Sequence, residues 1–307
     1  WGHSKVELIS EDTASDNKKT LSAVLKLITV DQVVAIVGPT WMDTFGSASP
    51  VADEKKIIIM TPSGAVTAVK QDKNYDNVFS TWYRSDVELQ KLPQYLAQKG
   101  VKKLAIIISQ DSFWVDVVAN LKKTLSQNEI MIIIEEHISP STTDVRSNIS
   151  KIKQSNTDAV FFGFNSEENL VAFLKQRKDL GLSLPLYTTE SIEEFAARED
   201  LRPFLVGTEF IAPKVLESSF ATNYKKRFGV DPVYSASNSY DAVRILVQAI
   251  ENGGSSASEI RSYIKNHEFD TVTFGKIHFD DLGGVVGGSF VIKKVTTGGT
   301  QMVLDPL

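Results

Sequence analysis

The sequence predicts an α/β protein with two parallel sheets, each covered by helices on both faces. Strand-like apolar runs alternate with amphipathic helical segments along most of the chain, which is typical of repeated β-α-β units. The strand-like runs are almost continuously apolar, as expected where both faces of a parallel sheet are buried. A single sheet of about ten such strands would be unusually wide. The 307 residues are therefore expected to form two sheets with separate cores.

The individual strands and helices follow from the spacing of apolar residues. We expect strands at residues 6–10, 33–37, 57–60, 104–108, 130–134, 159–162, 184–188, 209–212, 275–279 and 289–295. We expect helices at residues 16–28, 87–99, 113–127, 144–155, 167–180, 220–228, 238–252 and 257–267. Gly100, Gly181 and Gly229 each come directly after one of these helices, where glycine commonly ends a helix.

Composition excludes several classes of protein. The chain has 33 Lys and Arg against 38 Asp and Glu, a formal net charge of -5, which argues against nucleic acid or an anionic membrane as partner. It contains no cysteine, so disulfides, thiolate metal sites and cysteine nucleophiles are excluded. No apolar run reaches the length that a membrane-spanning helix needs.

The segment between residues 31 and 64, DQVVAIVGPTWMDTFGSASPVADEKKIIIMTPSG, is the most informative part of the chain. It contains a buried strand, a turn that opens at Gly38-Pro39, a helix, a second buried strand and a turn from Thr61 to Gly64. In such a parallel β-α-β unit, the loops at the carboxyl ends of the strands line the crevice where ligands bind. Both loops here are rich in small residues, which let backbone N–H groups approach a bound molecule.

Catalysis has little support in the sequence. The four histidines, His3, His137, His267 and His278, show neither zinc-site nor triad spacing. The chain lacks a G-x-S-x-G nucleophile elbow, a nucleotide phosphate-binding loop and a G-x-G-x-x-G dinucleotide fingerprint. The acidic pairs at 193–194 and 280–281 read as a solvated helix start and a turn. We therefore expect no enzyme, no cofactor and no metal site.

Two acidic residues are candidates for ligand binding. Glu190 directly follows the strand expected at 184–188, at the crevice end, where a carboxylate can pair with a ligand ammonium group. The alternative is an N-cap or first-turn acid of a helix at 192–197. Asp43 has the same two interpretations, a ligand contact or the N-cap of the helix that runs through Ser49.

Aromatic residues follow several of the expected strands. Trp41, Phe113, Trp114 and Phe164 all fall in loops after strands, where such side chains can form the wall of a small-molecule pocket. Taken singly, each is more often a core residue. Their equivalent positions make the two interpretations about equally probable.

Five segments together resemble a known family. They are VELISEDTASDNKK, VVAIVGPTWMDTFGSASPVADEKKIIIMTPSGAV, VKKLAIIISQDSFW, FFGFNSEENLVAFLKQRKDLGL and IHFDDLGG. In this order and spacing, which covers nearly the whole chain, they resemble the type I periplasmic substrate-binding proteins of branched-chain amino acid ABC transporters. The resemblance implies two Rossmann-like lobes joined by a three-segment hinge. It implies residues 1–109 and 238–270 in lobe 1, and residues 110–237 and 271–307 in lobe 2.

The resemblance also implies the binding residues. Relatives hold a ligand carboxylate with N–H groups and hydroxyls of the first two loops, where this chain has Trp41, Met42 and Asp43, then Ser63, Gly64 and Ala65. In lobe 2, Glu190 matches the acid that meets the ligand ammonium, Phe113 the aromatic that packs on the ligand, and Asn165 and Ser166 the next loop.

The chain departs from the family pattern at two places. Relatives usually carry two serines where this chain has Met42 and Asp43, so either Asp43 turns away from the ligand or the ligand differs, because a carboxylate facing a carboxylate is costly. Relatives also begin with a strand, a ligand-contacting loop and a helix before the segment that matches VELISED, and we assign no contacts from that loop.

We therefore expect an extracytoplasmic solute receptor, not an enzyme. It would trap a small molecule, an amino acid or a related metabolite, between two lobes and deliver it to the permease of an ABC transporter. It would be a monomer, located in the periplasm or held by a lipid anchor. The alternative is a ligand-sensing ectodomain or regulatory module of the same fold.

Overall fold

The computed structural model describes residues 6–70, 75–214, 218–230, 232 and 235–304. The chain divides into two compact units. Unit 1 comprises Trp1–Arg84 and Val215–Gly288, and unit 2 comprises Ser85–Lys214 and Ser289–Leu307. Each unit has a sheet of parallel strands covered by helices, so the predicted α/β class is confirmed.

The bounds of the units differ from the lobes predicted at 1–109 with 238–270 and at 110–237 with 271–307. Residues 85–109 belong to unit 2 because β4 (Lys103–Ser109) pairs with β5 (Met131–Ile138) on one side and β6 (Ala159–Gly163) on the other. Residues 271–288 belong to unit 1, where they complete a small antiparallel sheet. The chain thus leaves unit 1 before β4 and not after it.

Unit 1 contains a parallel sheet in the order β1-β2-β3 and an antiparallel sheet in the order β11-β10-β9. The strands are β1 (Ala35–Val37), β2 (Ile58–Thr61), β3 (Val78–Ser80), β9 (Phe269–Thr271), β10 (Gly275–Phe279) and β11 (Val285–Gly287). The strand predicted at 6–10 was wrong: this segment pairs with no strand of the described chain, and Val6 and Leu8 are 47% and 73% exposed. An apolar run forms a strand only where a neighbouring strand completes its hydrogen bonds.

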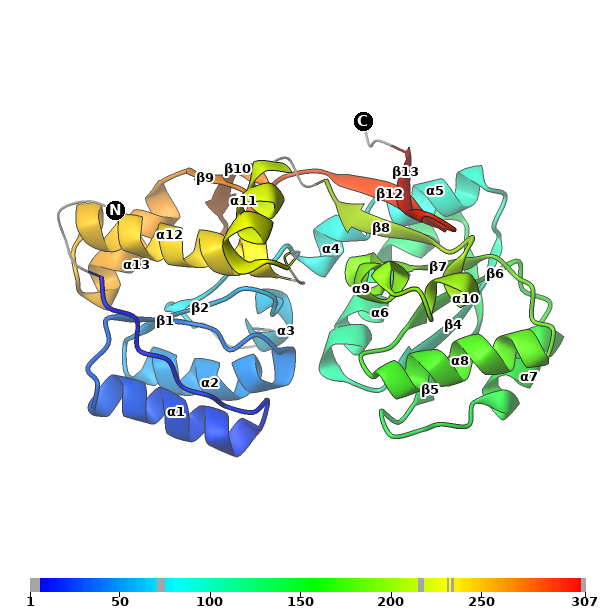
Figure 1. The fold of residues 1–307 in the computed structure, drawn as a ribbon, viewed down its shortest axis with the longest axis horizontal. Helices are drawn as coiled ribbons and strands as arrows, with labels where there is room; N and C mark the ends of the chain where they lie inside the picture. The colour runs from blue at the N-terminus through cyan, green and yellow to red at the C-terminus, as the bar shows by residue number, and fades with distance from the viewer. Residues whose placement is uncertain (1–5, 71–74, 215–217, 231, 233–234, 305–307) are drawn as a thin grey trace. The chain divides into compact units, whose positions relative to one another are not determined.

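Helices cover both faces of the parallel sheet of unit 1. They are α1 (Asn17–Thr29), α2 (Met42–Glu54), α3 (Val66–Lys70), α11 (Ser218–Phe228), α12 (Ala236–Gly253) and α13 (Ala257–Asn266). The helices α1 and α2 lie on one side of β1 and β2, and α12 and α13 lie on the other side (Figure 1). Phe45, Ala48 and Ala52 of α2 are fully buried against Ile59 of β2. This packing fixes the start of α2 at the end of the sheet.

Unit 2 contains one sheet of seven strands in the order β13-β12-β8-β7-β6-β4-β5. The strands not yet located are β7 (Leu186–Thr189), β8 (Glu209–Pro213), β12 (Phe290–Thr296) and β13 (Gly299–Leu304). The strands from β5 to β8 are parallel, and β12 and β13 extend the sheet in antiparallel pairs. The carboxyl ends of the five parallel strands therefore lie along one edge of the sheet, where their loops meet.

The helices of unit 2 follow the predicted alternation with one exception. They are α4 (Ser85–Glu88), α5 (Leu92–Gln98), α6 (Ser112–Leu125), α7 (Arg146–Gln154), α8 (Glu167–Asp179), α9 (Glu193–Ala197) and α10 (Arg202–Leu205), with 3-10 turns η1 (Ser126–Asn128) and η2 (Glu190–Ile192). The single helix predicted at 87–99 is divided into α4 and α5. Pro93 lies in the first turn of α5, the one helical position that tolerates its missing N–H.

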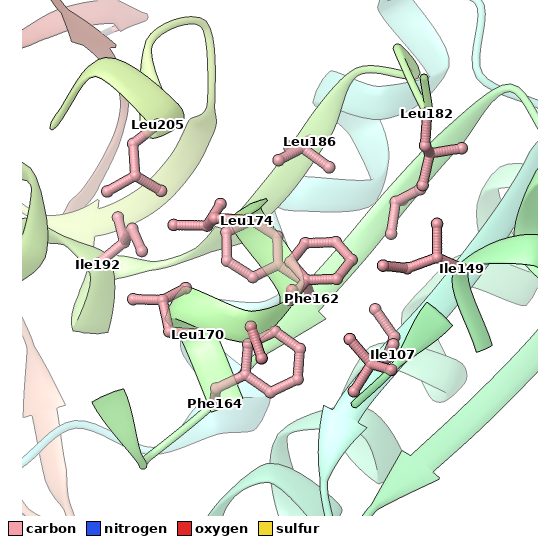
Figure 2. Packing of buried hydrophobic residues seen from close by; sticks show 14 of the residues in the cluster. Ile107, Ile149, Phe162, Phe164, Leu170, Leu174, Leu182, Leu186, Ile192 and Leu205 are labelled. Carbon is pink, nitrogen blue, oxygen red and sulfur yellow. The ribbon is translucent and has the colours of Figure 1, made fainter. Parts of the chain in front are cut away.

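The core of unit 2 is rich in aromatic rings on the face covered by α7, α8, α9 and α10. Phe162 of β6 stacks on Phe173 of α8 with 5.4 Å between ring centroids, and Phe164 lies 5.3 Å from Phe173 (Figure 2). On the other face, Trp114 of α6 is fully buried and packs on Phe161 at 6.3 Å. Side chains thus pack on both faces of the central strands of this sheet.

Candidate functional site

Two turns of unit 1 are joined at the carboxyl ends of β1 and β2. The Ser63 hydroxyl donates to the carbonyl oxygen of Thr40 at 2.5 Å, and the Thr61 hydroxyl donates to that of Pro39 at 2.7 Å. The Gly64 N–H in turn donates to the Thr61 hydroxyl oxygen at 3.1 Å. The structure therefore brings together the two loops that the sequence analysis selected.

The second turn is buried and tightly packed. Ser63 is 6% exposed and Ala65 is 2% exposed. A Cβ atom on Gly64 would lie 2.9 Å from a ring carbon of Phe45, so only glycine fits against α2 here. The packing of Gly64 against Phe45 thus fixes the position of the turn beside the start of α2.

The predicted residues Trp41, Met42 and Asp43 form the start of α2. Trp41 is the N-cap residue, and its side chain is 53% exposed. The Met42 side chain is buried in the core, so only its backbone faces the helix end. Asp43 is exposed in the first turn, where a negative charge is favoured by the helix dipole. Asp43 is therefore not the N-cap, and its charge does not have to be buried.

Three predicted residues of unit 2 lie at the carboxyl ends of β4 and β6. Phe113 is half-buried in the first turn of α6, with its ring 5.2 Å from the ring of Trp114. The Asn165 N–H donates to the Ser109 hydroxyl oxygen at 3.4 Å, which joins the ends of the two strands. Ser166 is the N-cap of α8 and accepts a hydrogen bond from a backbone N–H at 3.0 Å, so its hydroxyl holds the helix.

Glu190 lies at the carboxyl end of β7, as the sequence predicts. It opens η2, immediately after the last residue of the strand, and is 5% exposed. The N-cap of η2 is Thr189, so Glu190 is not an N-cap, but it does lie in the first turn of η2, as the other half of the alternative interpretation has it. Burying a carboxylate is costly unless cations or hydrogen-bond donors reach it, so this position is typical of a functional acid.

Two of the four aromatic residues proposed as pocket walls are core residues. Trp114 is fully buried and Phe164 is 4% exposed, and both pack within unit 2. Trp41 and Phe113 remain accessible at strand ends. For the adjacent pair Phe113 and Trp114, the sequence alone could not say which ring turns inward at the start of α6.

Sequence reasoning missed the polar residues that hold the loops in place. Ser109 donates to a carboxylate oxygen of Asp111 at 2.5 Å, and Asp111 accepts the Trp114 N–H at 3.0 Å as the N-cap of α6. Thr61 has the equivalent role in unit 1. The available signal was a hydroxyl residue at the last position of each strand, followed within a few residues by a helix.

Two of the histidines and Glu193 of an acidic pair lie in local contacts. No group of three or more His, Asp or Glu side chains suited to a metal occurs among the described residues. His137 lies 2.7 Å from Glu135, His267 stacks on Tyr263, and His3 lies outside the described residues. Glu193 pairs with Lys293 at 2.6 Å. No helix in the described part of the chain is long and apolar enough to cross a membrane.

A cavity of unit 1 lies near the first of these loops. It has a volume of about 680 Å³ and runs along β1, α1 and α12 and beside residues 6–13. Of the predicted binding residues, only Trp41 contributes to its wall. This cavity is therefore distinct from the surface formed by the Thr61–Ala65 turn.

Known proteins with similar sequences are solute-binding proteins. The chain is 25% identical over 305 residues to the Leu/Ile/Val-binding protein BraC3 of Rhizobium johnstonii, a match that covers 96% of this chain and 81% of that protein. It is 22% identical to a leucine-, isoleucine-, valine-, threonine- and alanine-binding protein of Pseudomonas aeruginosa, over 94% of this chain and 78% of that protein.

Solved structures share the fold at lower identity. A leucine-binding protein of Thermotoga maritima superposes with a TM-score of 0.85 at 18% identity, covering 99% of this chain and 89% of that one. A solute-binding protein of an ABC transporter from R. palustris, solved with benzoate, gives 0.83 at 16% identity, covering 99% and 86%. The type I periplasmic-binding-protein fold predicted from the sequence is confirmed.

The family model described as periplasmic binding protein matches residues 2–300, nearly the whole chain. The predicted class, an extracytoplasmic solute-binding receptor, is confirmed, and nothing in the similar proteins supports a sensory module. This is a class of receptors and not of enzymes. The two joined turns at the strand ends and the match over both units lead to one conclusion: the chain belongs to the periplasmic binding protein family.

Proposed function

We propose that the protein is the solute-binding protein of an ABC transporter and that it captures a small α-amino acid. The observation that carries this proposal is the buried carboxylate of Glu190 at the end of β7, combined with the joined turns of unit 1. The carboxylate suits a ligand ammonium group, and the turns suit a ligand carboxylate.

The unit 1 half of the proposed site consists of Trp41, Met42, Asp43, Ser63, Gly64 and Ala65. The first turn of α2 presents backbone N–H groups that lack intrahelical partners, which favours an anion. The Ser63 hydroxyl already donates its proton to Thr40, so toward a ligand its oxygen acts as an acceptor. A zwitterionic amino acid offers both a carboxylate for the helix end and N–H donors for Ser63.

The unit 2 half consists of Phe113, Asn165, Ser166 and Glu190. Glu190 would pair with the ammonium group in a site from which closure excludes water, where the attraction is stronger than in solution. The half-buried ring of Phe113 would pack on the apolar side chain of the ligand. Ser166 would act mainly through the end of α8, which it caps.

The ligand class follows from this chemistry and from the similar proteins. Curated relatives are named for leucine, isoleucine and valine, and structural neighbours were solved with leucine, isoleucine, benzoate and 4-hydroxybenzoate. We favour a branched-chain amino acid, because an aromatic acid has no ammonium group to meet Glu190. We propose further that the protein is a periplasmic or lipid-anchored monomer that delivers the ligand to permease subunits.

Titration calorimetry with a small ligand panel tests this function. Leucine, isoleucine, valine, phenylalanine, benzoate and 4-hydroxybenzoate are titrated separately into the full chain. We expect saturable binding of at least one branched-chain amino acid, with a rise in melting temperature by mass action. Binding of benzoate alone would overturn the amino-acid assignment, and failure of every ligand would overturn the proposed ligand class.

A further inference from the structure

A cavity in unit 2 lies at the amino ends of β7 and β8, whereas Glu190 lies at the carboxyl end of β7. The cavity has a volume of about 350 Å³ and adjoins the first residues of β7 and β8. Its wall is formed by Lys99, Arg177, Ser183, Leu184, Pro185, Leu186, Tyr187, Val206, Gly207, Thr208, Glu209 and Lys294. Because it opens at the amino ends of the strands, it has no part in the proposed solute site.

The cavity wall carries three cationic side chains and one carboxylate. Glu209 is 6% exposed, and its Oε1 lies 3.3 Å from Lys294 Nζ and 4.0 Å from Lys99 Nζ. Its Oε2 accepts a hydrogen bond from the Tyr95 hydroxyl at 2.9 Å. With Lys99, Arg177 and Lys294 against Glu209, the wall has a net charge of +2. The two lysines share one carboxylate, so the cavity attracts anions.

Among the described residues, no carboxylate forms an ion pair with Arg177, in contrast to Lys99 and Lys294 of the same wall. The Arg177 Nη1 is buried and makes no hydrogen bond with any described residue. Burial alone lowers the pKa of the guanidinium, and no carboxylate raises it. Arg177 as a whole is only partly buried, and its side chain lines the cavity, so an oxyanion bound there would give the accessible part of the guanidinium an acceptor and a counter-charge.

We propose that this cavity binds a small dianionic oxyanion of the phosphate type, with Arg177 as the principal donor. The forked guanidinium matches two oxygens of such an anion, and Lys99 and Lys294 supply the remaining charge. The cavity volume of about 350 Å³ leaves room for a phosphate group. The site would bind its anion independently of the transported solute.

Inorganic phosphate tests the proposal by a nuclear magnetic resonance titration of the ¹⁵N-labelled full chain at constant ionic strength. We expect saturable shifts of the Ser183 and Gly207 amide signals in the wild type. Arg177→Gln should weaken phosphate binding about tenfold or more, since it removes a charge-assisted pair. Lys175→Gln is the matched control: Lys175 lies on the same helix, is exposed and does not line the cavity. It should leave phosphate affinity unchanged.

Two outcomes would overturn the proposal. One is the absence of saturable shifts at Ser183 and Gly207 in the wild type. The other is equal phosphate affinity for Arg177→Gln and Lys175→Gln. If Arg177→Gln does not fold, as judged by circular dichroism, Lys99→Gln replaces it, because Lys99 is 45% exposed in its side chain. Lys99→Gln should weaken phosphate binding several-fold relative to Lys175→Gln, and equal affinities would again contradict the site. Sulfate is expected to compete and acetate to bind less tightly.

Discussion

Replacing Glu190 by Gln is expected to weaken leucine binding by at least about a hundredfold. The carboxylate is 5% exposed at the end of β7, so a ligand ammonium group bound there would be desolvated. An ammonium group buried without its counter-charge costs about 3–5 kcal/mol, and 1.4 kcal/mol corresponds to a factor of ten. Gln keeps the shape of the side chain and removes only the charge. Titration calorimetry with leucine measures the change directly.

The matched control for Glu190→Gln is Glu194→Gln. Glu194 lies four positions further along the chain, is exposed on α9, and undergoes the same chemical change. Its leucine affinity should stay within about twofold of the wild type, as expected for an exposed charge. Equal affinities of the two variants would refute the role of Glu190. Tighter benzoate binding by Glu190→Gln would show that the site accepts acids without an ammonium group once the charge is removed.

Replacing Gly163 by Ala is expected to destabilise unit 2 by about 3 kcal/mol. A Cβ atom on Gly163 would lie 2.2 Å from a ring carbon of Trp114, far inside van der Waals contact. Trp114 is fully buried against Phe161 and cannot move aside without disturbing the core. Overpacking of this kind typically costs about 1–3 kcal/mol, and this contact lies at the severe end. Urea unfolding followed by circular dichroism measures the change in stability.

Two further variants test whether the clash with Trp114 causes the effect. Gly46→Ala makes the same substitution in the interior of α2, where a Cβ atom meets nothing within 4 Å. It should stabilise the protein by about 0.5–1 kcal/mol. The double variant Gly163→Ala with Trp114→Leu should be more stable than the sum of the two single changes predicts. Unfolding of Gly163→Ala at the same urea concentration as the wild type would contradict the interpretation.

The buried strands of unit 2 were predictable because their chemistry is local. The strands expected at 104–108 and 159–162 correspond to β4 at Lys103–Ser109 and β6 at Ala159–Gly163. A parallel strand buried on both faces must be apolar at nearly every position, and few other structures produce such short runs. The helix predicted at 167–180 corresponds to α8 at Glu167–Asp179, with Gly181 just beyond its end as the sequence predicts.

Elements that depend on a neighbour were not predictable from the same patterns. Residues 6–10 have the composition of a strand, but they pair with no strand of the described chain. Whether a strand forms depends on a neighbouring strand, and the residues of the segment itself do not reveal one. The division of the predicted helix at 87–99 is different, because Pro93, at the start of α5, is a local signal for a new helix start. The assignment of β4 to unit 2 required its pairing with β5 and β6. The predicted bounds of the lobes differ from the observed units for this reason.

The candidate site shows the same division. Both loops of unit 1 could be selected from their small residues after apolar strands, and Glu190 from its position after β7. The hydrogen bond from Ser63 to Thr40, which joins the loops, links residues 23 positions apart and leaves no local pattern. Trp114 is buried while its neighbour Phe113 in α6 is accessible. The space for the Trp114 ring depends on Gly163, the last residue of β6.

The sequence by itself determined the α/β class, the position of most strands and helices, and the loops that follow the strands. These properties depend on apolar periodicity and on turn residues, which act over a few neighbouring positions. Only the tertiary structure decided where the units begin and end, which aromatic residues are core, and that Arg177, Lys99 and Lys294 share one cavity. Those properties arise from contacts between segments that are distant in the sequence. Such contacts form, and contribute to stability, only when the chain has folded.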